Sequence, residues 1–167
     1  MANIGIFYGS MTGNTQEVAE KIHTRFGQDA DLYSISDASA DTLSAYQYLL
    51  LGSSTWGIGE LQDDWYDGLE KLDATDLSDK TVALFGTGDP DGYPDSFVDA
   101  IGILYEKVIA KGATVVGFWP TEGYEYDASK AEKDGRFVGL VIDENNQSHL
   151  TEERIDKWVE ELKAIMQ

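Results

Sequence analysis

The chain has 167 residues, with 12 Lys and Arg against 31 Asp and Glu, which gives a formal net charge of −19. At this length, and with 42% hydrophobic residues, we expect one domain that covers residues 1–167. There is no cysteine, which excludes disulfides, thiolate zinc sites, cysteine nucleophiles and cysteine-bound iron–sulfur clusters. Any redox chemistry would therefore depend on an organic cofactor.

The negative charge argues against nucleic acid as a partner, because phosphate contacts need Lys and Arg to release counterions. It argues equally against binding to anionic membranes. No apolar run approaches the roughly 18 residues that span a bilayer, and residues 1–8 lack the length and basic start of a secretory signal. We therefore expect a cytoplasmic protein with no membrane contact, and the dense charge makes a monomer the simplest expectation.

The first apolar run, residues 4–8, predicts a buried strand, and the stripe from Val18 to Phe26 predicts an amphipathic helix. The loop between them combines glycines with the hydroxyls of Ser10, Thr12 and Thr15. Such hydroxyls, together with the N–H groups of a helix N-terminus, fit a phosphate; an ordinary threonine-rich helix cap is the alternative. Because the loop has no Lys or Arg and no Gly-Lys-Ser/Thr ending, it suits a phosphomonoester such as that of FMN better than a nucleoside triphosphate.

The next runs, residues 32–35, 48–51 and 82–85, predict three more strands. The last two are apolar at consecutive positions, which is typical of a parallel sheet covered by helices on both faces. Each is followed by a glycine-rich loop with one large aromatic residue, Trp56 in one and Tyr93 in the other. These loops would lie at the same edge as the phosphate loop, so the two aromatics either form a slot for a planar ring or only cover the core.

The remaining pattern predicts helices around Ile101 and around Trp158, the latter with Thr151 as its N-cap. Two apolar runs, residues 115–119 and 137–142, could belong to one strand position of the sheet. The polar stretch between them, residues 120–136, is long for a loop inside a compact domain.

Together these motifs resemble the flavodoxin family over essentially the whole chain. The resemblance implies an α/β fold: a doubly wound, five-stranded parallel sheet of order 2-1-3-4-5 with helices on both faces. Residues 120–136 resemble the insertion that splits the last strand in long-chain flavodoxins, and the family leaves the role of that insertion open.

The resemblance also implies non-covalently bound FMN as the cofactor. The residues themselves predict no metal, since His23 and His149 lie far apart without paired carboxylates at ligand spacing. The residues that would bind the phosphate are Ser10, Met11, Thr12, Gly13, Asn14 and Thr15. Those that would surround the ring are Ser54, Thr55, Trp56, Gly57, Ile58, Gly59, Thr87, Gly88, Asp89 and Tyr93. In this reading Trp56 and Tyr93 sandwich the isoalloxazine, and the Gly57 peptide turns its carbonyl toward flavin N5, which a glycine tolerates at little steric cost.

The implied function is a low-potential one-electron carrier that shuttles between semiquinone and hydroquinone and turns over no substrate of its own. Acidic residues without compensating cations in the three loops would disfavour the second electron. Two alternatives stay open: an FMN-dependent NAD(P)H or quinone reductase, and a scaffold of the same fold that binds no cofactor.

Residues 60–79 contain eight acidic residues and one basic residue, Lys71. A helix is predicted there with Leu61, Trp65, Leu69 and Leu72 on its apolar side. On the opposite side it would carry Glu60, Asp63, Asp64, Asp67 and Glu70. We interpret this acidic side as a docking face for basic redox partners, namely a flavodoxin/ferredoxin reductase and electron acceptors; a merely solvated face is the alternative.

Overall fold

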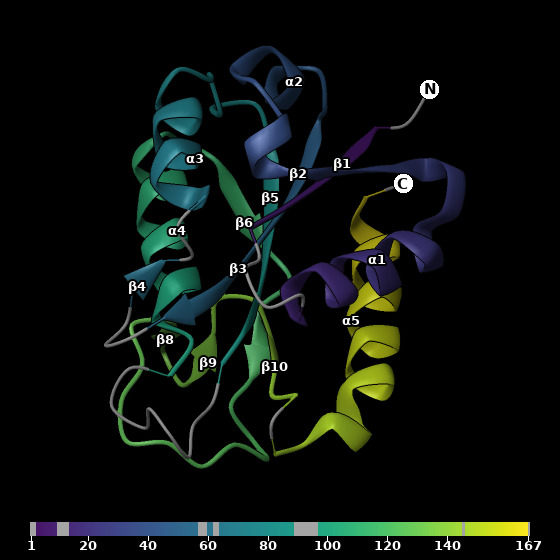
Figure 1. The fold of residues 1–167 in the computed structure, drawn as a ribbon, viewed down its shortest axis with the longest axis vertical. Helices are drawn as coiled ribbons and strands as arrows, with labels where there is room; N and C mark the ends of the chain where they lie inside the picture. Colours follow the sequence, from purple (N-terminus) through teal and green to yellow (C-terminus); the bar gives the residue numbers. More distant parts are fainter. Residues whose placement is uncertain are drawn as a thin grey trace.

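The computed structural model describes residues 3–9, 14–56, 60–61, 64–88, 97–144 and 146–166, and gives only the backbone at residues 56, 60 and 61. A parallel sheet runs through the middle of the molecule in the order β10-β5-β3-β1-β2 (Figure 1). Its strands are β1 (Ile4–Gly9), β2 (Ala30–Ser34), β3 (Tyr48–Trp56), β5 (Thr81–Thr87) and β10 (Leu140–Ile142). The order 2-1-3-4-5 implied by the family resemblance is thereby confirmed.

The fifth strand position is split into two halves. β6 (Thr114–Val116) pairs with the first half of β5, and β10 pairs with the last half. Between them, β7 (Trp119–Pro120), β9 (Arg136–Phe137) and β8 (Glu132–Lys133) form a small antiparallel sheet in that order. We call residues 117–139 the insertion.

The predicted halves of the split strand were too long. Trp119 and Phe137 pair with each other in the small sheet of the insertion instead of joining the parallel sheet. Both side chains are buried, Phe137 against Phe97 and Tyr124. An apolar run thus marks burial at these positions, but it does not say which sheet buries them.

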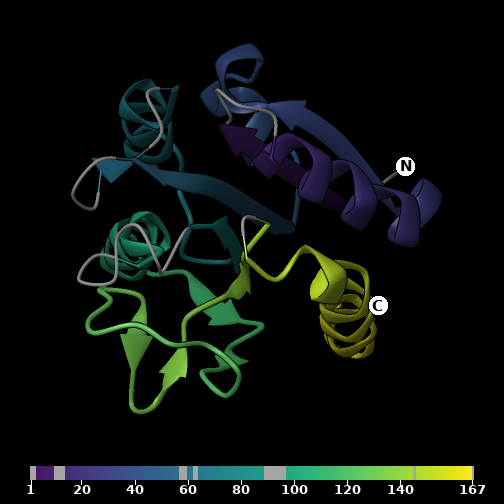
Figure 2. The same cartoon turned by 60° about the horizontal axis from the view of Figure 1, so that its bottom comes forward.

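Helices cover both faces of the sheet. α1 (Asn14–Phe26) and α5 (Thr151–Ile165) lie on one face, and α3 (Asp64–Asp73) and α4 (Asp99–Ala110) lie on the other (Figures 1 and 2). α2 (Ala40–Ser44) is a single short turn near the opposite edge from the insertion. Short 3-10 turns follow α1 (Gly27–Asp29), follow β2 (Ile35–Asp37) and precede α5 (Ser148–Leu150). Among the described residues, none of the helices is long and apolar enough to cross a membrane.

The predicted apolar stripes hold these helices against the sheet. Ile22 in α1 and Leu162 in α5 are fully buried, and each such side chain contributes about 1.5–3 kcal/mol by leaving water. Two buried tryptophans also satisfy their ring N–H groups with backbone carbonyls, since Trp65 donates to the Gly52 carbonyl at 2.7 Å and Trp158 donates to the Gly117 carbonyl at 2.8 Å.

Two predicted helix starts were wrong. The 3-10 turn before α5 runs directly into the helix, so Leu150 takes the N-cap position and Thr151 is the first helical residue. The second is the acidic helix, which begins at Asp64: Glu60 and Leu61 form β4 (Glu60–Leu61), antiparallel to the end of β3. A strand of two residues is too short to show a hydrophobic periodicity, so the sequence pattern did not predict it.

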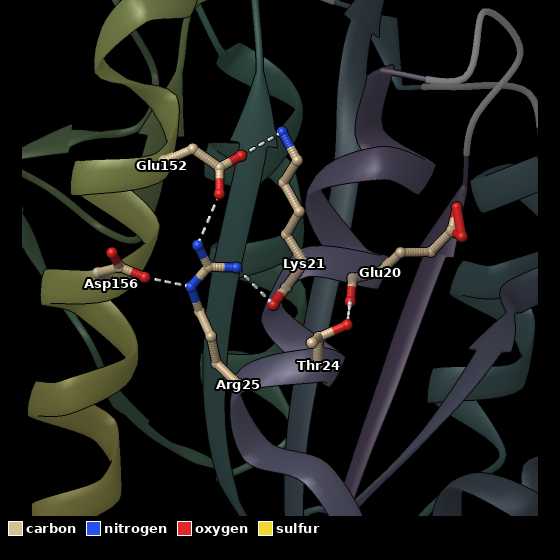
Figure 3. Close-up of polar contacts among 6 residues, drawn as sticks. All are labelled: Glu20, Lys21, Thr24, Arg25, Glu152 and Asp156. Carbon is tan, nitrogen blue, oxygen red and sulfur yellow. Dashed lines mark hydrogen bonds and ion pairs between the residues drawn. The ribbon is translucent and has the colours of Figure 1, made fainter.

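Four charged side chains join α1 to α5 on the surface (Figure 3). Lys21 Nζ lies 2.5 Å from Glu152 Oε2, and Arg25 Nη2 lies 2.7 Å from Glu152 Oε1. Arg25 also pairs with Asp156, and its Nη1 donates to the Lys21 carbonyl at 2.9 Å. One carboxylate therefore accepts from two cations of the neighbouring helix.

We expect Glu152→Gln to destabilise the fold by about 0.5–1 kcal/mol at neutral pH and low salt, a small effect because the side chain is 59% exposed. Hydrogen bonds from Lys21 and then Arg25 hold the pKa of Glu152 below its usual 4.5. A depressed carboxyl pKa stabilises the fold above the unfolded pKa, and that contribution disappears as the pH falls through the folded pKa. Chemical unfolding should therefore show the deficit of the variant shrinking in high salt and well below pH 4.5.

The matched control is Glu160→Gln, on the exposed side of α5 and outside the ion pairs of the described residues. It should have little effect at either pH. A deficit of Glu152→Gln that persisted at low pH would contradict the ion-pair explanation.

Candidate functional site

The carboxyl ends of β1, β3 and β5 meet at one edge of the sheet, beside the first turn of α1 (Figure 1). This edge is where a doubly wound fold places its ligands. Six of the predicted site residues are described there, and they come from three segments of the chain: Asn14, Thr15, Ser54, Thr55, Thr87 and Gly88.

A buried hydrogen bond joins α1 to the end of β5. The hydroxyl oxygens of Thr15 and Thr87 lie 2.9 Å apart, and the two residues are 0% and 5% exposed. Thr87 therefore points to the face of the sheet that α1 covers. This contact fixes the second residue of the helix over the end of the strand.

Ser54 shares this face. It is registered with Thr87 across the parallel pair β3 and β5, and neighbouring residues in register point to the same side of a sheet. Its Oγ is buried and has no hydrogen-bond partner among the described residues. Since buried hydroxyls are normally hydrogen-bonded, this oxygen indicates that a polar group completes the site near the N-terminus of α1.

Thr55 has a role that the sequence did not reveal. Its Oγ1 accepts the backbone N–H of Ala100 at 3.0 Å. Thr55, which lies in β3, therefore caps the N-terminus of α4. The N-cap residue of α4, Val98, makes no side-chain cap of its own and has a φ of 48° in the left-handed region. The donor and acceptor are 45 positions apart, and no local motif connects them.

Gly88 is held closely at the end of β5. Its N–H donates to the Ile142 carbonyl at 3.2 Å, so this N–H is used within the fold. A Cβ at this position would lie 2.9 Å from Val98 Cγ1, so the strand end and the start of α4 can approach this closely only because residue 88 is a glycine.

The described residues cover only part of the predicted site. The site residues outside the described ones are Ser10, Met11, Thr12, Gly13, Gly57, Ile58, Gly59, Asp89 and Tyr93, and the same holds for the side chain of Trp56. Their roles stay predictions, and so does the expected turn of the Gly57 peptide.

The acidic side of α3 is exposed as predicted over part of its length. Asp67 and Glu70 are exposed, whereas Trp65 is buried on the opposite side of the helix. Lys71 is turned inward and donates to the Ile35 carbonyl at 2.7 Å. Asp64 is half-buried, Asp63 is outside the described residues, and Glu60 belongs to β4.

Comparison with known proteins decides the family. The family model for flavodoxin matches residues 6–158. The chain belongs to the flavodoxin family. A flavodoxin from Synechocystis sp. is 50% identical over 169 residues, which cover 100% of this chain and 99% of the relative. One from Nostoc sp. is 52% identical over 162 residues, which cover 96% and 95%.

A solved flavodoxin has the same fold. The crystal structure of Fusobacterium nucleatum flavodoxin bound to flavin mononucleotide is similar with a TM-score of 0.94 and 33% identity, and the match covers 100% of both chains. The resemblance of the chain to the flavodoxin family is therefore confirmed for the family and for the fold.

We expect Thr87→Val to destabilise the protein by about 1–3 kcal/mol, because it leaves the buried Thr15 hydroxyl without its partner. Replacing both threonines with valine should cost less than the sum of the two single changes, since no polar group is then left unpaired. Chemical unfolding of the four proteins of this double-mutant cycle measures the coupling. Additive effects would show that the hydrogen bond contributes nothing.

Proposed function

We propose that this flavodoxin carries electrons one at a time on a non-covalently bound FMN at the carboxyl edge of the sheet. The family is one of electron carriers, and the similar Fusobacterium nucleatum protein is bound to flavin mononucleotide. When bound, FMN supplies a ring system that can accept and release single electrons. The reductase alternative is not favoured, because the relatives that match the whole chain at about half identity are flavodoxins.

The buried Ser54 hydroxyl is the observation that carries the cofactor site. It has no partner among the described residues, and it faces the side of the sheet where Thr15 lies in the first turn of α1. A phosphate at this position would accept from Ser54 and from the N–H groups of the helix N-terminus. The residues present therefore fit the phosphate of FMN, with Asn14 and Thr15 on the helix side.

The ring would lie over Thr55 and Gly88, between the aromatics predicted at positions 56 and 93. The Thr55 hydroxyl is bound to α4, so this residue would meet the ring through its backbone. The net charge of −19 would disfavour adding a further negative charge at the ring, which supports a low potential for the second electron.

Removing the Ser54 hydroxyl tests the phosphate site. Ser54→Ala should weaken FMN binding by about 10- to 100-fold, because a hydrogen bond to a charged group contributes about 1.5–3 kcal/mol. Binding of riboflavin, which lacks the phosphate, should change little. Flavin fluorescence quenching by the apoprotein measures both affinities.

Ser44→Ala, at an exposed serine of α2, is the control and should bind both flavins as the wild type does. If Ser54→Ala lost equal affinity for FMN and for riboflavin, Ser54 would not contact the phosphate. A wild-type protein that binds neither flavin would refute the proposed function itself.

We further propose that the exposed acids of α3 steer basic redox partners toward this edge. Asp67 and Glu70 are exposed, and the nearby Lys71 ammonium donates to the Ile35 carbonyl and forms no ion pair with either of these two acids. A surface of one sign raises the encounter rate with a partner of opposite sign, and salt weakens the effect.

Charge reversal on α3 tests the docking face. The double variant Asp67→Lys, Glu70→Lys should slow reduction by a basic reductase about tenfold at low ionic strength, with a shallower dependence on salt. The control, Glu160→Lys, reverses an exposed charge on α5, which lies on the other face of the sheet. Equal slowing by the two changes in stopped-flow measurements would indicate a general charge effect and no docking face on α3.

A further inference from the structure

The first residues of α4 lie between the insertion and the cofactor edge of the sheet. On one side, Ala100 N–H is capped by Thr55, and Val98 packs against Gly88; both Thr55 and Gly88 are candidate ring contacts. On the other side lies the insertion, which Figure 2 shows alongside α4. The same short segment therefore touches the site and the insertion at once.

Three hydrogen bonds join this segment to the insertion. The Phe97 N–H donates to the Ala128 carbonyl at 3.2 Å, and the Ser129 hydroxyl donates to the Phe97 carbonyl. The Lys130 N–H donates to Asp99 Oδ1 at 2.7 Å. Ser129 Oγ also accepts the N–H of Ala131 at 3.1 Å. This bond fixes the Ser129 hydroxyl and the backbone of the insertion around Lys130.

The Asp99 carboxylate is an unusual group to find in this position. It is only 5% exposed. Burial raises its pKa, and the hydrogen bond from the Lys130 N–H opposes that rise. The carboxylate is thus shielded from water and is hydrogen-bonded by a backbone donor of the insertion.

The backbone of Val98 has a conformation that is unfavourable for a valine. It is a β-branched residue with φ 48° and ψ 30°, a region that such side chains rarely adopt. Strained residues of this kind persist only where the surroundings over-determine them, and they gather at functional sites. Here the flanking hydrogen bonds of Phe97, Asp99 and Ala100 supply that constraint.

Packing reinforces the contact between insertion and helix. The Phe97 ring lies among three rings of the insertion, at centroid distances of 5.9 Å to Tyr124, 5.4 Å to Tyr126 and 5.9 Å to Phe137. One turn into α4, a Cβ on Gly102 would lie 2.5 Å from the Lys130 carbonyl carbon. The absence of a side chain at residue 102 lets the insertion backbone lie directly on the helix.

We propose that Asp99 is a positioning residue for the flavin ring: by anchoring the insertion to the start of α4, it holds Val98 in its strained conformation and so places Thr55 and Gly88. This rests on the proposed function. It gives the insertion a role in shaping the ring half of the cofactor site, whereas the phosphate half is built by α1 and the ends of β3 and β5 without it.

Flavin affinity of three variants tests the role of Asp99. Asp99→Ala removes the acceptor. It should weaken the binding of FMN and the binding of riboflavin by the same factor, about tenfold, because the defect lies at the ring and not at the phosphate. Asp99→Asn keeps an oxygen for the Lys130 N–H and should stay within about threefold of the wild type. Asp127→Ala, at an exposed acid of the insertion, should change nothing.

The visible circular dichroism of the bound flavin provides a second readout. It should change in Asp99→Ala and keep the wild-type form in Asp99→Asn. Because both variants lose the charge, this difference would show that the hydrogen-bond acceptor at residue 99, and not its charge, positions the ring. Wild-type affinity for both flavins in a folded Asp99→Ala would overturn the proposal, and so would a loss confined to FMN.

Gly102→Ala disturbs the same contact from the helix side. It tests the proposal also in the case that Asp99→Ala does not fold. The added methyl would push the insertion away from α4, so both flavins should again bind more weakly by a common factor. Unchanged binding would refute the proposal. A wild-type protein without flavin affinity would instead refute the proposed function on which it rests.

Discussion

β5 is hydrogen-bonded along both of its edges, and much of the structure follows from that constraint. One edge pairs with β3 over the full length of the strand, and the other pairs first with β6 and then with β10. The chain therefore has to leave the sheet after Val116 and return before Leu140. This path puts the insertion against α4, next to the strand ends where the cofactor site is proposed.

Several cations are bound to backbone carbonyls or rings of the fold. Lys80 donates to the carbonyls of Ser44 and Tyr46, and Lys111 donates to that of Asp73. The Arg154 guanidinium lies 4.2 Å from the centre of the Tyr124 ring. These side chains close turns and fasten the insertion, and the net charge of −19 comes from the excess of acids over all the cations.

The general fold was predictable because it depends on local patterns. Consecutive apolar residues such as Leu49 to Leu51 indicated strands covered on both sides, and the spacing of Ile155, Trp158 and Leu162 indicated a helix with one buried face. Within the site, the hydroxyl of Thr15 was predicted at the start of α1, and the structure places it there.

What escaped prediction depends on partners that are distant in the sequence. Thr55 caps a helix 45 positions away, and the left-handed conformation of Val98 is held by contacts with the insertion. Trp119 was assigned to the parallel sheet because apolar composition reports burial and carries no information about the pairing strand. Whether a threonine binds a ligand or a helix is likewise decided by tertiary packing.

The register of the split strand has a consequence for how such a chain can change length. Val116 pairs with Ala83 and Leu140 pairs with Phe85, so a single position, opposite Leu84, separates the two halves. Gly139 lies at this point, and a Cβ there would be 2.1 Å from the Leu84 carbonyl oxygen. Excising residues 117–138 would join the halves through this glycine into one strand with its ladder in phase. The register of the sheet therefore does not depend on residues 117–138.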